Sequence, residues 1–119
     1  MTKHEVRFTV DLAIHMDKFD EFERIAQIMI AGTRKEPGAL GYDWCLSKDR
    51  SRCRLIETYV DANAVVAHLT GPVVQELVPR LLDVSRLSGF EVYGDPGPQG
   101  TEMLTGLGAE IFSLWRGLK

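Results

Sequence analysis

Apolar and polar residues alternate with a period of two in several parts of the chain. In HEVRFTVDL (residues 4–12) every second residue is apolar and the residues between them are polar. This pattern is typical of a strand with one buried face. ALGYDWCLS (39–47) and CRLIETYV (53–60) predict a hairpin around the polar turn KDRS, and LSGFEVYG (87–94) predicts a fourth strand.

Between these strands the apolar residues recur every three or four positions, as they do in amphipathic helices. MDKFDEFERIAQIMIAGTRK (16–35) predicts the longest helix, with Asp17 as its N-terminal cap and the following EPG as its end. DANAVVAHL (61–69), capped by its first residue, and VVQELVPRLLDVS (73–85) predict shorter helices. The apolar stripe of the tail predicts an extra C-terminal helix at about residues 101–117.

The predicted order of elements is β-α-β-β-α-β followed by the C-terminal helix. It is typical of a ferredoxin-like α+β fold, in which a four-stranded antiparallel sheet carries its helices on one face. The 119 residues predict a single domain with its core at 4–95. Ile56 and Val60 are apolar on the side of their strand opposite Leu55. An uncovered apolar sheet face favours a homodimer in which two sheets pack together.

Composition and charge argue against several classes of protein. The net charge is −3 and basic residues cluster only in KDRSRCR, so no nucleic-acid partner is expected. The sequence shows neither an apolar stretch of membrane length nor the apolar segment of a signal peptide, so we expect a cytoplasmic protein with no membrane partner. Cys45 and Cys53 flank the hairpin turn without the ligand spacing of a metal site. Two reduced thiols are expected, with a redox pair as the alternative.

Several short pieces of the chain resemble one protein family. They are EPGALGYDW after the first helix, ETYVD at the end of the third strand, AHL in the short helix and FEVYG at the end of the sheet. Residues 4–95 resemble the antibiotic biosynthesis monooxygenase domain of the dimeric α+β barrel superfamily. The resemblance implies a homodimer with a pocket between the sheet and the helices of each subunit. Similar proteins include cofactor-independent oxygenases of quinols and anthrones, haem-degrading oxygenases, and proteins with no known reaction.

Haem degradation is disfavoured by the same comparison. Haem degraders of this family use an asparagine on the first strand, a tryptophan on the short helix and a haem-ligating histidine about ten residues later. Here the only asparagine is Asn63, His68 stands at the tryptophan position, and Val78 stands at the position of the ligand. We therefore expect no cofactor.

His68 is the candidate catalytic base. It follows Val65 by three residues and precedes Leu69, which places it half exposed at the edge of the apolar stripe of its helix. The resemblance implies that it removes a proton from a phenol or quinol hydroxyl, after which the electron-rich anion reacts with O2 without flavin or metal. The alternative is a histidine that only hydrogen-bonds at the edge of the core.

Other residues complete the candidate site. The candidate ring-binding residues are aromatic and belong to the central hairpin: Tyr42, Trp44 and Tyr59. For any single one of them, plain core packing is the favoured interpretation. Thr9 is a candidate hydrogen-bond donor if its strand face lines the pocket. Glu57 lies between apolar neighbours, so it is expected to pair with an arginine or to orient His68. The sequence thus predicts a cofactor-free monooxygenase for a small aromatic substrate and O2, or else a non-catalytic ligand-binding or stress-associated dimer.

Overall fold

The computed structural model describes residues 1–118. Within these residues a mixed sheet of five strands has the order β2-β3-β1-β4-β5. The strands are β1 Val6–Ile14, β2 Ala39–Leu46, β3 Arg52–Tyr59, β4 Ser85–Tyr93 and β5 Glu110–Phe112. β1 pairs antiparallel with β3 and β4, β2 pairs antiparallel with β3, and β5 runs parallel to β4. The four antiparallel strands expected from the sequence are confirmed, and a fifth extends the sheet.

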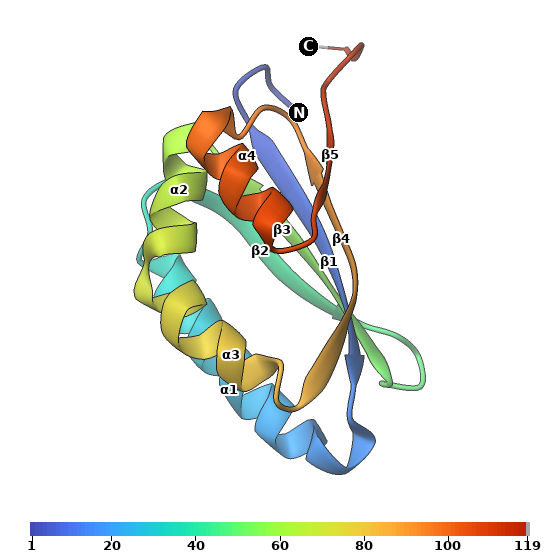
Figure 1. Ribbon diagram of the computed structural model, residues 1–119. Helices are drawn as coiled ribbons and strands as arrows, with labels where there is room; N and C mark the ends of the chain where they lie inside the picture. The colour runs from blue at the N-terminus through green and yellow to red at the C-terminus, as the bar shows by residue number, and fades with distance from the viewer. Residues whose placement is uncertain (119) are drawn as a thin grey trace.

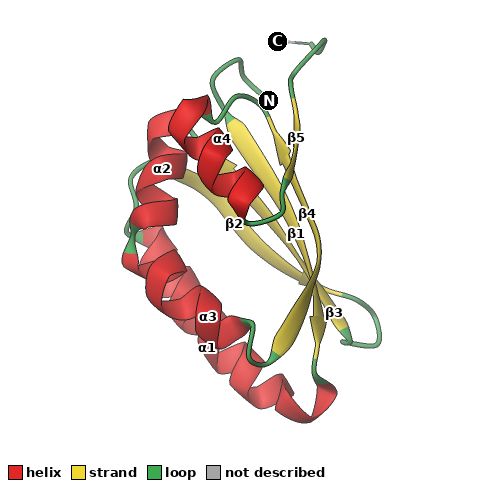
Figure 2. Ribbon diagram, in the orientation of Figure 1, coloured by secondary structure: helices red, strands yellow, loops and turns green. Residues whose placement is uncertain are grey.

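The helices cover one face of the sheet (Figures 1 and 2). They are α1 Phe19–Arg34, α2 Ala62–Thr70, α3 Val78–Leu81 and α4 Gly97–Gly106, with a 3-10 turn η1 Met16–Lys18 before α1 and a π-helical turn η2 Val73–Leu77 between α2 and α3. Two layers, a sheet and its helices, are the ferredoxin-like α+β arrangement that the order of elements predicted.

The core lies between the two layers, where the apolar faces of the strands and of the helices pack together. Buried residues of β1 (Val6, Phe8, Leu12) share it with those of α1 (Phe22, Ile25, Met29). Burial of each such side chain contributes roughly 1.5–3 kcal/mol to stability. The core is divided into two clusters. One contains residues of α1 and α3, and the other contains residues of α2 and α4.

The starts of the helices agree with the sequence only in part. The backbone N–H of Ala64 donates to Oδ1 of Asp61 at 2.9 Å, which confirms the predicted cap of α2. Asp17 lies inside η1, and Lys18 precedes α1 without a side-chain cap hydrogen bond. The prediction that Asp17 caps the long helix is therefore wrong, because a 3-10 turn occupies the positions assigned to its first turn.

The C-terminal helix expected at about residues 101–117 is also corrected. α4 is residues 97–106, and Gly108 has φ +91°, a left-handed conformation that suits glycine. The chain then runs along the free edge of β4 as β5, and the N–H of Gly94 donates to the carbonyl of Phe112 at 2.9 Å. The apolar stripe of the tail is therefore divided between a helix and an edge strand.

The two cysteines lie on the predicted hairpin but face opposite sides of it. Across the hairpin, Cys45 pairs with Arg54 and Cys53 pairs with Leu46, so the two thiols occupy alternate positions of the pleat. Cys53 is buried, Cys45 is exposed, and both are free. This geometry favours separate thiols over a redox pair.

Candidate functional site

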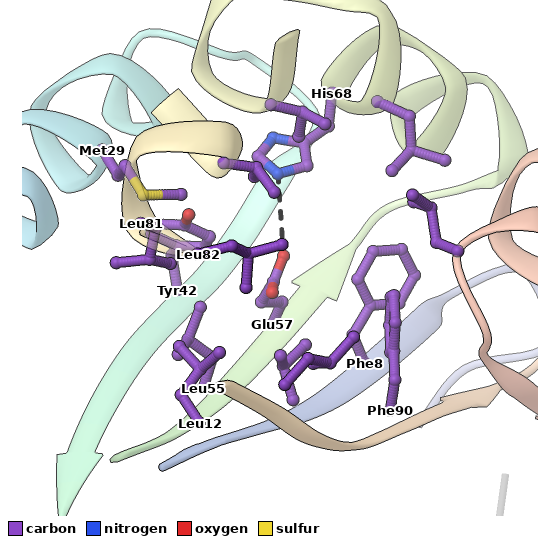
Figure 3. Close-up of a pocket in the computed structure, with 16 residues that line it drawn as sticks. Phe8, Leu12, Met29, Tyr42, Leu55, Glu57, His68, Leu81, Leu82 and Phe90 are labelled. Carbon is purple, nitrogen blue, oxygen red and sulfur yellow. Dashed lines mark ion pairs between the residues drawn. The ribbon is translucent and has the colours of Figure 1, made fainter. Parts of the chain in front are cut away.

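A cavity of about 150 Å³ lies between the sheet and the helices, lined by residues of both core clusters (Figure 3). Its wall is mostly leucine and valine, while Tyr42, Glu57 and His68 gather at one end. Leu82 and Leu107 also line the cavity, although they are 41% and 47% exposed. These two leucines therefore mark its mouth.

His68 is buried beside this cavity, with only 3% of its surface exposed. The rings of Tyr42 and Tyr59 pack against its imidazole with centroid distances of 5.8 and 5.0 Å. The half-exposed position expected for His68 is therefore wrong. Helix periodicity predicts only the direction in which His68 points from the axis of α2. The two tyrosines that cover its ring belong to the sheet, so the burial of the ring depends on the tertiary fold.

Glu36 holds the other side of the ring. Its Oε1 lies 2.8 Å from Nδ1 of His68. Because a carboxylate only accepts hydrogen bonds, Nδ1 is the donor, and a neutral ring then keeps its lone pair on Nε2. Nε2 faces Oε1 of Glu57 at 3.7 Å, which is too long for a hydrogen bond (Figure 3). A hydroxyl group that enters this end of the cavity meets both Nε2 and the Glu57 carboxyl.

The turn after α1 brings Glu36 to His68. The carbonyl of Gly38 accepts a hydrogen bond from the N–H of Val60 at 2.9 Å, which fixes the turn to the end of β3. A Cβ atom on Gly38 would overlap the Cβ of Ala64 on α2. Glycine at this position therefore lets α2 approach closely enough for its histidine to reach Glu36.

The carboxyl of Glu57 is buried, with 4% of the residue surface exposed, whereas the Glu36 side chain is 22% exposed. The hydroxyl of Tyr59 donates to Oε1 of Glu57 at 2.5 Å. Burial raises the pKa of the Glu57 carboxyl, while His68 and the Tyr59 hydrogen bond partly oppose that shift. The carboxyl therefore keeps its proton to a higher pH than an exposed glutamate does. Glu57 contacts His68 and Tyr59 rather than the arginine expected as one possibility.

The structure brings some of the predicted ring-binding residues together and separates others. Tyr42 lines the cavity, and Tyr59 lies behind the polar end, against His68. Trp44 packs on Phe22 and Tyr42, each at 5.9 Å between ring centroids, outside the cavity lining. Of the three expected aromatic residues only Tyr42 lines the cavity, and Phe8 and Phe90 of β1 and β4 supply its other aromatic rings.

Thr9 lies on the opposite face of the sheet from the cavity. Its hydroxyl donates to Oε1 of Glu91 at 3.2 Å, and its neighbours Phe8 and Val10 point inward instead. Thr9 therefore does not reach the site. Glu36 does reach the site, through its contact with His68. No periodic pattern in the sequence marks Glu36, because it follows the last turn of α1 and meets His68 only in the folded chain.

Two kinds of feature are absent from residues 1–118. Within this part of the chain, no three or more His, Cys, Asp or Glu side chains form a group that could hold a metal ion. Within the same residues, no helix combines the length and apolar character needed to cross a membrane.

Comparison with known proteins identifies the family. The model of the family described as antibiotic biosynthesis monooxygenase matches residues 6–80, which is more than half of the chain. A search of curated proteins found no match.

Solved structures agree in fold. MupZ from Pseudomonas fluorescens superposes with a TM-score of 0.82 at 20% identity, covering 98% of this chain and 94% of that one. A conserved protein from Methanosarcina mazei Go1 gives a TM-score of 0.72 at 18% identity, covering 78% and 94%. A protein named antibiotic biosynthesis monooxygenase gives 0.65 at 22%, covering 73% and 92%. At these identities the likeness shows the fold alone, and the family match carries the assignment: this chain belongs to the antibiotic biosynthesis monooxygenase family.

Proposed function

We propose that this protein is a cofactor-independent monooxygenase that acts on a small aromatic quinol with O2. One observation carries the proposal: buried His68 and Glu57 lie at one end of an otherwise apolar cavity, and the partly exposed Glu36 contacts His68 from behind it. A cavity of about 150 Å³ with apolar walls holds a molecule the size of benzene. The volume supports a single-ring quinol over the three fused rings of an anthrone.

His68 begins the reaction as a general base. Its Nε2 takes the proton of the substrate hydroxyl, and Glu36 stabilises the resulting imidazolium through the contact at Nδ1. Glu57, when protonated, donates a hydrogen bond to the phenolate oxygen. The leucine and valine wall excludes water, which strengthens both interactions.

Oxygen chemistry follows from the electron-rich anion. The quinol anion transfers one electron to O2, and the two radicals combine to form a C–O bond to the ring. The hydroperoxide then loses water, and the proton taken by His68 leaves with that water. One oxygen atom enters the ring, the other becomes water, and the quinol becomes a hydroxyquinone, so the substrate supplies all four electrons. The protein contributes the base, the orientation and the dry cavity.

We also infer that the protein is a homodimer formed through the sheet face that the helices leave uncovered. Tyr93 and Phe112 stack on this face with centroids 5.5 Å apart, and Phe112 is 43% exposed. Ile56 lies on the same face of β3, one position from the buried Leu55. Apolar side chains on an uncovered sheet support packing against a second copy.

Oxygen uptake with a panel of hydroquinones, using metal-free protein, tests the activity. We expect uptake above the rate of autoxidation, and His68→Ala should lower it about 10²–10⁴-fold, as loss of a general base does. Glu23→Gln, an exposed change on α1, serves as a control that leaves the rate unchanged. Saturable binding of hydroquinones without oxygen uptake would instead support the non-catalytic ligand-binding alternative.

A further inference from the structure

The side chains that line the cavity change in character along the strands, from polar at one end to apolar at the other. Three inward levels of the sheet line the cavity in succession: Phe8 with Glu57, Val10 with Leu55 and Phe90, and Leu12 with Leu87. The distance from the first level to the third is four residues, which is roughly 13 Å along β1 at about 3.3 Å per residue. The polar groups therefore occupy only the first level of an elongated space.

The helix side of the cavity follows the same gradient. His68 of α2 faces Glu57 at the polar end. Leu81 of α3 belongs to the same core cluster as Leu12 and Leu55, at the apolar end. In Figure 3, Leu55 and Leu12 lie on the far side of Glu57 from His68. Both walls therefore change from polar to apolar in the same direction.

We infer that the cavity selects an uncharged phenol or quinol with one ring and a short saturated alkyl substituent, its hydroxyl toward His68 and its alkyl group toward Leu12. The choice of a hydroxyl-bearing ring rests on the proposed function. The alkyl group rests on the aliphatic third level of the wall, and the lack of charge rests on both apolar levels.

Charge and size limit the ligand further. Among the described residues that line the cavity, none is lysine or arginine. A carboxylate on the ligand would therefore lose its water without gaining a cationic partner, which is costly. A substituent that extends beyond the graded wall must pass Leu82 and Leu107 at the mouth.

Calorimetric titration without oxygen tests this selection independently of turnover. The probes are phenol, 4-ethylphenol, 4-butylphenol and 4-hydroxybenzoate. From phenol to 4-butylphenol we expect the dissociation constant to fall by about fourfold for each methylene that enters the aliphatic wall, since each buried methylene is worth about 0.8 kcal/mol. 4-Hydroxybenzoate should bind at least tenfold more weakly than 4-ethylphenol. Equal affinities along the alkyl series, or tighter binding of 4-hydroxybenzoate, would overturn the inference.

A variant tests the direction of the alkyl group. Leu87→Phe adds volume at the apolar end and should remove the gain of 4-butylphenol over phenol. Leu46→Phe makes the same change at the exposed end of β2 and should leave the whole series unaltered. A Leu87→Phe protein that binds 4-butylphenol as tightly as wild type refutes the orientation. If Leu87→Phe does not fold, the wild-type series still decides the selection.

The two proposals fail in different ways. Graded binding of alkylphenols, with no oxygen uptake from the matching alkylhydroquinones, refutes the oxygenase and supports the selection. If oxygen uptake occurs and its Michaelis constant does not change with the alkyl substituent, the oxygenase is supported and the selection is refuted.

Discussion

Replacing Glu36 by glutamine isolates the part of the site that the sequence did not reveal. The change keeps the shape of the side chain and an oxygen that can accept from Nδ1 of His68, but it removes the negative charge 2.8 Å from the ring. A hydrogen bond to a charged group is worth about 1.5–3 kcal/mol and a neutral one about 0.5–1.5 kcal/mol. The difference, about 1–1.5 kcal/mol, is the stabilisation that an imidazolium at His68 loses.

This difference sets the expected rate. About 1.4 kcal/mol corresponds to a factor of ten, so Glu36→Gln should lower kcat by about tenfold through charge alone. The loss should reach about 10⁴-fold if the amide instead donates to Nδ1 and leaves the wrong ring nitrogen protonated. The neutral state of His68 already has a good hydrogen bond in the variant, so the melting temperature should fall by only about 3–6 °C.

The assay combines quinol-dependent oxygen uptake with calorimetry on the same protein. Glu23→Gln makes the identical chemical change at an exposed position of α1 and should alter neither quantity. Imidazole nitrogen chemical shifts at His68 report directly which nitrogen carries the proton. If Glu36→Gln keeps wild-type kcat with an unchanged ring tautomer, Glu36 only holds the fold together and its proposed role at His68 is refuted.

Four further outcomes are expected. His68→Ala should lower the free energy of unfolding by about 3 kcal/mol, measured in urea, because it leaves a cavity and strands buried polar partners; an unchanged midpoint would contradict the burial of the ring. The folded-state pKa of Glu57 is raised above its ordinary value of 4.5, so its contribution to stability is complete below that pH and is lost as pH rises through the folded pKa. Glu57→Gln should therefore gain stability relative to wild type as the pH rises above 4.5 in urea titrations, and a difference independent of pH would exclude this titration. Light scattering should give about twice 13.4 kDa, and Phe112→Arg on the uncovered sheet face should shift the mass toward the monomer; a wild-type monomer would rule out the dimer. Ellman's reagent should modify Cys45 quickly and Cys53 only on unfolding, since burial raises the pKa of Cys53 to about 11; equal rates would contradict the opposite facing of the two thiols.

The sequence alone determined the strands, the long helix and their order. The alternation in β1 and the spacing of Phe22, Ile25 and Met29 on α1 are local patterns with periods of two and 3.6, and each marks the face that must be buried. The cap at Asp61 is equally local, since donor and acceptor lie three residues apart. Local patterns of this kind can be recognised in the sequence because the backbone geometry of a strand or helix alone decides which residues share a face.

Only the tertiary structure decided which residues meet. Glu36 and His68 are 32 positions apart in the sequence. They are in contact because Gly38, in the turn after α1, lets α2 approach closely. The alternation of β1 places Thr9 and Phe8 on opposite faces of the sheet. Only the packing of the helices decided that the cavity lies on the face of Phe8. The tail became β5 because the edge of β4 offered unpaired backbone groups, which a helical stripe in the sequence does not reveal. Pairing between distant segments depends on how whole elements pack, and no local period encodes that packing.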